Sequence, residues 1–140
     1  MRNIEKSPQY DLYRLTKNLY LNKEKIVPEN ADMRCVKSTI INRAYYSSYS
    51  LASEWLDFYF DFQIKPPRKF KRNKPFISGH VQVLNALFKY EKEESHLNLG
   101  RLKDLRTKAD YHLESKILDN EVKNSLVYMD RIFNDLKFGD

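Results

Sequence analysis

The segment from Met33 to Phe60 constrains the fold most, because it contains neither glycine nor proline and its apolar residues recur at helical spacing. These residues form two stripes, Val36, Ile40, Ala44, Ser47, Leu51, Trp55 and Phe58 in one and Ile41, Tyr45, Ala52, Leu56 and Tyr59 in the other. Two stripes require two sets of neighbours. We therefore expect this segment to be the central helix of a bundle.

Four other segments show helical spacing of their apolar residues. The expected helices span about residues 8–25, 33–60, a stretch that begins near residue 78, 99–113 and a stretch that begins after residue 119. Ser7, Asp32 and Ser78 stand immediately before three of these segments, where a short polar side chain can cap a helix.

The chain is expected to form one all-α domain over residues 1–140, an antiparallel bundle of four to five helices. A length of 140 residues suits a single core, and a hydrophobic fraction of 41% argues against global disorder. With only three glycines, the chain lacks the frequent turns that a β-sandwich or barrel needs. Short connections favour antiparallel neighbours.

The formal net charge of +6 and the isoelectric point of about 9.3 favour an anionic partner, either a nucleic acid or an anionic membrane surface. No apolar run approaches the length of a membrane span, and the first residues lack the features of a signal peptide. The single cysteine, Cys35, excludes an internal disulfide and a cysteine-based zinc site. We expect a cytoplasmic protein without a membrane anchor.

Residues 65–74 form a basic segment in which six of the ten residues are Lys or Arg and none is acidic. Prolines prevent a regular helix here, and Phe70 adds one aromatic ring among the cations. Cations and a stacking ring suit contact with nucleic-acid phosphates and bases, although a solvated loop is the alternative. The predicted nucleic-acid-binding residues are Arg68, Lys69, Lys71, Arg72 and Lys74.

The stretch LRTKADYHL, residues 105–113, contains the candidate reactive residues Arg106, Asp110 and His112. Arg106 and Asp110 are four residues apart, which is the spacing of an intrahelical ion pair. On a regular helix Arg106 and His112 lie about 120° apart, so they do not share one groove. Either a local loosening of the helix or a second copy packed about a two-fold axis could bring them to one phosphate.

Other chemistry has weaker support in the sequence. The three histidines, His80, His96 and His112, lie in different segments without the spacing of a metal site. No glycine-rich phosphate loop and no nucleophile-elbow motif is present. We expect neither a metal nor another cofactor.

Three segments together resemble the HEPN domain (higher eukaryotes and prokaryotes nucleotide-binding). They are NRAYYSSYSLASEWL at residues 42–56, SGHVQVLNAL at residues 78–87 and LRTKADYHL at residues 105–113. The resemblance covers roughly residues 10 to 137. It implies a bundle of four or five helices that usually dimerises, in agreement with the helices expected above.

Active HEPN proteins are metal-independent ribonucleases with an Arg followed, after four to six residues, by a His. Arg106 and His112 have five residues between them and match this pattern. The resemblance implies that Arg106 stabilises charge on the scissile phosphate and that His112 acts on the ribose 2′-hydroxyl or the leaving 5′-oxygen. The product expected is a 2′,3′-cyclic phosphate, and Asp110 completes the predicted catalytic set.

The first functional hypothesis is a dimeric HEPN ribonuclease of the toxin or phage-defence type, with RNA guided by the basic segment. An antitoxin or a nucleotidyltransferase is then a candidate partner, although Leu113 and Glu114 occupy the positions where such members can carry a modified tyrosine. Thr107 replaces the Asn, Asp or His that often follows the Arg, and many relatives with an ADY motif lack the His. The alternatives are therefore a non-catalytic HEPN module that binds a nucleotide or a partner protein, and a plain helical scaffold.

Overall fold

A computed structural model of the protein describes residues 7–29, 32–66 and 77–139. Within these ranges the chain forms five α-helices and no strand, so the all-α prediction is confirmed. The helices are α1 (Pro8–Leu21), α2 (Met33–Phe60), α3 (Gly79–Lys89), α4 (Glu93–Tyr111) and α5 (Asp119–Asp135).

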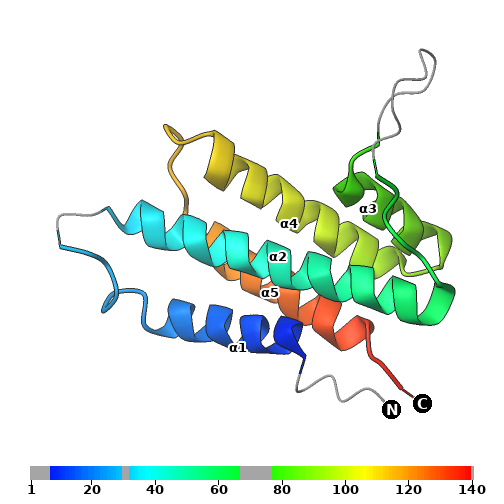
Figure 1. Ribbon diagram of the computed structural model, residues 1–140. Helices are drawn as coiled ribbons and strands as arrows, with labels where there is room; N and C mark the ends of the chain where they lie inside the picture. The colour runs from blue at the N-terminus through cyan, green and yellow to red at the C-terminus, as the bar shows by residue number, and fades with distance from the viewer. Residues whose placement is uncertain (1–6, 30–31, 67–76, 140) are drawn as a thin grey trace.

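Helices α1, α2, α4 and α5 lie side by side, and the short α3 lies at the end of the bundle where α2 finishes (Figure 1). The consecutive helices α1 and α2 run in opposite directions, as do α4 and α5, so the predicted antiparallel packing holds for these pairs. Helices α2 and α4 also run in opposite directions, whereas the packed pair α2 and α5 runs in the same direction. Helix α3 packs against both α2 and α4. This arrangement brings three helices together at one end of the bundle.

The three expected N-caps are present. The side chains of Ser7, Asp32 and Ser78 each accept a hydrogen bond from a backbone N–H in the first turn of α1, α2 and α3, respectively. These bonds satisfy N–H groups that have no partner inside the helix. The local sequence therefore determined where these helices begin.

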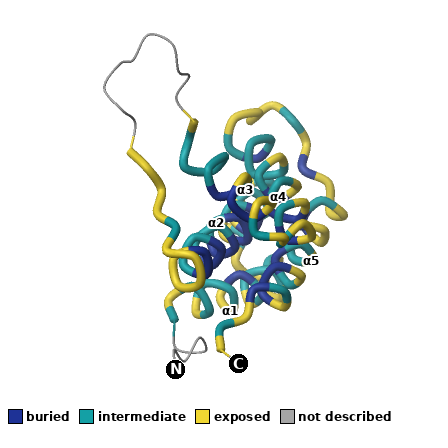
Figure 2. The backbone as a smooth tube through the Cα atoms, turned by 90° about the vertical axis from the view of Figure 1, so that its right-hand side faces the viewer, coloured by how far each residue is buried: buried dark blue, intermediate teal, exposed yellow. Residues whose placement is uncertain are grey.

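The core confirms both stripes of α2 as far as Trp55 and Leu56, while Phe58 and Tyr59 beyond them are 52% and 41% exposed. Buried positions follow the inward sides of the helices (Figure 2). The hydroxyl of Ser47 lies 3.3 Å from the sulfur of Met129 in α5, so the small residues of α2 allow close packing as expected.

Helix α4 differs from the prediction at both ends. It begins at Glu93 rather than near Leu99. The first turns contain polar residues that are buried and form hydrogen bonds within the fold. Ser95 is fully buried and its hydroxyl donates to the carboxylate of Asp135 in α5. At the other end the helix stops at Tyr111 rather than at residue 113, and Leu113 is 69% exposed.

Helix α1 is also shorter than expected, since it ends at Leu21 rather than near Lys25. The sequence spacing predicts an inward stripe of Leu12, Leu15, Leu19 and Tyr20, of which Leu19 and Tyr20 pack against the core. Leu15 is 49% exposed, whereas Thr16 is fully buried and its hydroxyl donates to the carbonyl of Leu12 at 2.7 Å. A threonine can take an inward position because that local bond satisfies its hydroxyl.

Candidate functional site

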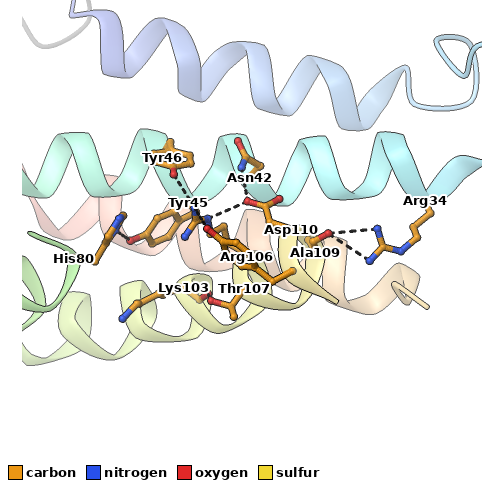
Figure 3. Close-up of polar contacts among 11 residues, drawn as sticks. Arg34, Asn42, Tyr45, Tyr46, His80, Lys103, Arg106, Thr107, Ala109 and Asp110 are labelled. Atoms are coloured by element: carbon orange, nitrogen blue, oxygen red, sulfur yellow. Dashed lines mark hydrogen bonds and ion pairs between the residues drawn. The ribbon is translucent and has the colours of Figure 1, made fainter. Parts of the chain in front are cut away.

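Polar and aromatic side chains from three helices meet at the junction of α2, α3 and α4 (Figure 3). We call this group the Arg106 cluster, and it comprises Asn42, Tyr45 and Tyr46 of α2, His80 of α3, and Arg106 and Asp110 of α4. The three α2 residues lie at intervals of three and four, which places them on one face of that helix. Arg106 and Asp110 are one turn apart on α4 and face it.

Arg106 is held by short hydrogen bonds to Asp110 and Tyr46 and by a longer one, of 3.4 Å, to the hydroxyl of Tyr111. Its Nε donates to Oδ2 of Asp110 at 3.0 Å, and its Nη2 donates to the hydroxyl of Tyr46 at 2.9 Å. The same carboxylate oxygen accepts from Nδ2 of Asn42 at 3.0 Å. The predicted ion pair between Arg106 and Asp110 is therefore confirmed, and with 15% of its side chain exposed the arginine has a fixed position.

Three tyrosine rings surround the guanidinium of Arg106. The ring centroids of Tyr45, Tyr46 and Tyr111 lie 5.7, 5.4 and 5.3 Å from its central carbon, within the range of cation–π attraction. Burial by itself would lower the pKa of Arg106, but Tyr46, Tyr111 and the carboxylate of Asp110 raise it above the usual value. Arg106 is thus a permanent, positioned cation.

His80 joins the cluster through Tyr45. The hydroxyl of Tyr45 forms a hydrogen bond with Nδ1 of His80, and the His80 ring lies 4.7 Å from that of Tyr49. Burial raises the pKa of Tyr45, so its phenol stays protonated. Burial, and next the positive charges of Arg106 and Lys103, lower the pKa of His80 from 6.5, which keeps the imidazole neutral near pH 7.

Gly79 allows the start of α3 to approach α2 at His80. A Cβ atom at this position would lie 3.1 Å from the Tyr49 hydroxyl and 3.1 Å from Cγ2 of Ile64. Both separations are tighter than ordinary van der Waals contact, so a side chain here would require its neighbours to shift by a few tenths of an ångström. From its sequence position His80 was considered only as a possible metal ligand, and the Gly-His pair at the start of a helix is the signal that could have placed it here.

His112 occupies a different environment from the Arg106 cluster. It is the residue that follows the last turn of α4, and its side chain is 57% exposed, with Nδ1 at 3.9 Å from the carboxylate of Glu114. Within the part of the chain that the structure describes, no hydrogen bond or ion pair joins His112 to Arg106. The motif spacing does not bring the two side chains together within the chain.

Arg34 fixes the backbone around His112. From the first turn of α2 its guanidinium donates to the carbonyl of His112 at 2.9 Å and to that of Ser115 at 2.8 Å. A weaker contact of 3.4 Å reaches the carbonyl of Ala109. A cation beside the carbonyls at the C-terminal end of α4 stabilises that end. The backbone at His112 is therefore anchored while its imidazole is exposed.

The predicted nucleic-acid-binding residues Arg68, Lys69, Lys71, Arg72 and Lys74 lie outside the described residues. The first cation of the basic segment, Lys65, is described. Its backbone N–H and carbonyl pair with the side-chain amide of Gln82 in α3 at 2.8 and 3.1 Å. The basic segment therefore begins against the same short helix that carries His80.

No family model matches the chain, and comparisons with curated proteins and with solved structures also find no match. Among the described residues, no three His, Cys, Asp or Glu side chains gather where they could hold a metal ion. None of the described helices combines the length and apolar character needed to cross a bilayer.

Proposed function

We propose that the protein is a HEPN-like, metal-independent endoribonuclease of the toxin or phage-defence type that acts as a homodimer. One observation carries the proposal. The three sequence segments that resemble the HEPN domain contribute Tyr46, His80 and Arg106, respectively, to a single cluster. Residues far apart in sequence thus surround one positioned cation, as a phosphate-binding site requires.

The cleavage that we propose is attack of the ribose 2′-hydroxyl on the adjacent phosphorus. The bond from the 2′-oxygen to phosphorus forms while the bond to the 5′-oxygen breaks, which leaves a 2′,3′-cyclic phosphate and a free 5′-hydroxyl. Arg106 stabilises the negative charge that builds on the phosphate oxygens. His112 transfers the proton, either from the 2′-hydroxyl or to the leaving oxygen.

The environment of His112 supports a role across a dimer interface. Its imidazole is exposed, and it stands between Tyr111 and Leu113, which are 66% and 69% exposed. Two large exposed side chains around a candidate catalytic group form a surface that a self-complementary partner would cover. In such a dimer the His112 of one subunit meets the Arg106 of its mate.

A second candidate function is a non-catalytic HEPN module that binds a nucleotide or a partner protein. The ion pair between Arg106 and Asp110 favours it, because that carboxylate competes with a phosphate for the guanidinium. The separate position of His112 favours it too. Under this alternative the cluster binds phosphate but no bond is broken.

Incubation of purified protein with single-stranded RNA in the presence of a chelator tests the proposal. We expect cleavage products that end in 2′,3′-cyclic phosphate, and no cleavage of a 2′-O-methylated RNA of the same sequence, since that RNA lacks the nucleophile. Binding of both RNAs without cleavage of either would favour the non-catalytic module. If the protein neither binds nor cleaves either RNA, the ribonuclease proposal is contradicted.

A further inference from the structure

The Arg106 cluster contains a histidine that the ribonuclease proposal does not use. His80 lies in the first turn of α3 and forms a hydrogen bond with Tyr45 of the cluster. Burial, and then the positive charges of Arg106 and Lys103, lower its pKa. Helices α3 and α4 therefore place three nitrogen-bearing side chains, two of them cationic, around one region of a single subunit.

We propose that His80 donates a hydrogen bond from Nε2 to a phosphate oxygen of the RNA bound by Arg106, so that each subunit holds a phosphate by itself. The inference rests on the proposed function, and it separates the two histidines by role. His80 binds the phosphate within one subunit, whereas His112 transfers a proton.

The bond to Tyr45 determines which nitrogen of His80 carries the proton. Tyr45 is 1% exposed, and its hydroxyl bonds to Nδ1 of the imidazole. A protonated phenol donates this bond, so Nδ1 of the neutral ring accepts it and the proton lies on Nε2. The ring can then offer a ligand only a donor, which suits a phosphate oxygen and disfavours a metal ion.

The electrostatic environment of His80 also favours an anion. The groups that face it are Tyr45, Tyr46 and Tyr49 from α2 and Lys103 and Arg106 from α4. None of these five carries a negative charge near pH 7, and the two α4 residues are cations. The first turn of α3 adds backbone N–H groups, which attract negative charge. A phosphate here would offset the cations that lower the pKa of His80.

The test measures binding of a 2′-O-methylated single-stranded RNA, which keeps the phosphates and cannot be cleaved by attack of its own hydroxyl. In His80→Asn the side-chain oxygen can still accept from Tyr45, but the donor at the Nε2 position is lost. In His80→Gln the amide restores a donor near that position. The matched control is His96→Asn, because His96 is half-buried and its Nδ1 bonds to the carbonyl of Leu84 away from the cluster.

We expect His80→Asn to weaken RNA binding by about tenfold or more, as for loss of one hydrogen bond to a charged group. His80→Gln should recover most of that loss, and His96→Asn should bind like the wild type. Equal binding by His80→Asn and the wild type would overturn the inference. Cleavage of unmodified RNA by the wild type, measured in parallel, shows whether the proposed function stands independently of it.

NMR titration of the His80 ring in the unmutated protein provides a second readout that does not depend on a variant. We expect added RNA to raise the pKa of His80. The same shift with inorganic phosphate or AMP would show that a single phosphate group is enough to occupy the site. An unchanged His80 pKa in saturating RNA would overturn the inference.

Discussion

Arg106 and His112 belong to one short motif, yet they differ in burial and in the number of side chains that hold them. The side chain of Arg106 is 15% exposed and is fixed by Asp110 and Tyr46, whereas the side chain of His112 is 57% exposed beyond the end of α4. The difference shows that regular motif spacing does not by itself assemble a site. On our proposal one subunit builds the phosphate-binding half and the second subunit supplies the proton-transfer half.

Replacement of Arg106 should have the largest effect. We expect Arg106→Ala to reduce RNA cleavage by about a thousandfold, because it removes the positioned cation at the phosphate. Arg106→Lys should retain part of the activity, since it keeps the charge but cannot reproduce the two fixed contacts of the guanidinium. Cleavage rates of both variants, with folding checked by circular dichroism, provide the measurement.

Arg101→Ala is the matched control for Arg106, since Arg101 lies on the same helix, is exposed, and packs near Tyr128 outside the cluster. It should cleave RNA like the wild type. A folded Arg106→Ala variant that cleaves RNA like the wild type would show that the Arg106 cluster does not take part in cleavage.

His112→Ala should come next in size and should split binding from cleavage. We expect cleavage to fall by about a hundredfold, because a proton-transfer group is lost. RNA binding should be unchanged, and the free energy of unfolding should change by no more than about 0.5 kcal/mol because the side chain is exposed. Weaker binding with an unchanged cleavage rate would reverse the roles given to the two halves of the motif.

Replacement of Arg34 should destabilise the protein through the backbone that follows α4, without a direct effect on the Arg106 cluster. Arg34→Ala removes the charged hydrogen bonds to the carbonyls of His112 and Ser115. We expect the free energy of unfolding to fall by about 2 kcal/mol. Chemical denaturation measures this change, with Arg131→Ala, an exposed arginine of α5, as the control. A loss no larger than that of the control would mean that the end of α4 does not depend on Arg34.

The smallest expected effect is the pH dependence that His80 gives to stability. Its pKa in the folded protein lies below the 6.5 of the free side chain, because of burial and then the charges of Arg106 and Lys103. As the pH falls below 6.5 the unfolded chain takes up a proton before the folded protein does, so the free energy of unfolding decreases. Once the pH is below the folded pKa, this loss levels off.

His80→Asn lacks this titration and keeps an acceptor for Tyr45. Urea denaturation between about pH 7.5 and pH 5 should therefore show a steeper loss of stability in the wild type than in the variant. Parallel pH profiles would mean that burial and the nearby cations do not act on His80 as the geometry indicates.

Local features of the sequence were sufficient for several parts of the structure. The caps at Ser7, Asp32 and Ser78 and the ion pair between Arg106 and Asp110 depend on residues within four positions of one another, and all were predicted. The central role of α2 followed from its two stripes. Such features require no knowledge of which helices pack together.

The remaining parts depend on tertiary packing and could not be predicted in this way. The first turns of α4 looked solvated in sequence, yet Ser95 is buried because Asp135 of α5 accepts its hydrogen bond. His80 reaches the Arg106 cluster through the packing of α3 on α2, and Gly79 beside it leaves little room for a Cβ atom next to Tyr49. Both contacts join different helices, so the spacing within either helix carries no sign of them.

Mixing two inactive variants tests most directly the claim that the halves of the site come from different subunits. Arg106→Ala and His112→Ala proteins are unfolded together, refolded together and assayed for RNA cleavage. We expect about a quarter of wild-type activity, because half of the dimers are mixed and each mixed dimer has one site with both residues. A mixture that stays as inactive as its two components would contradict the account.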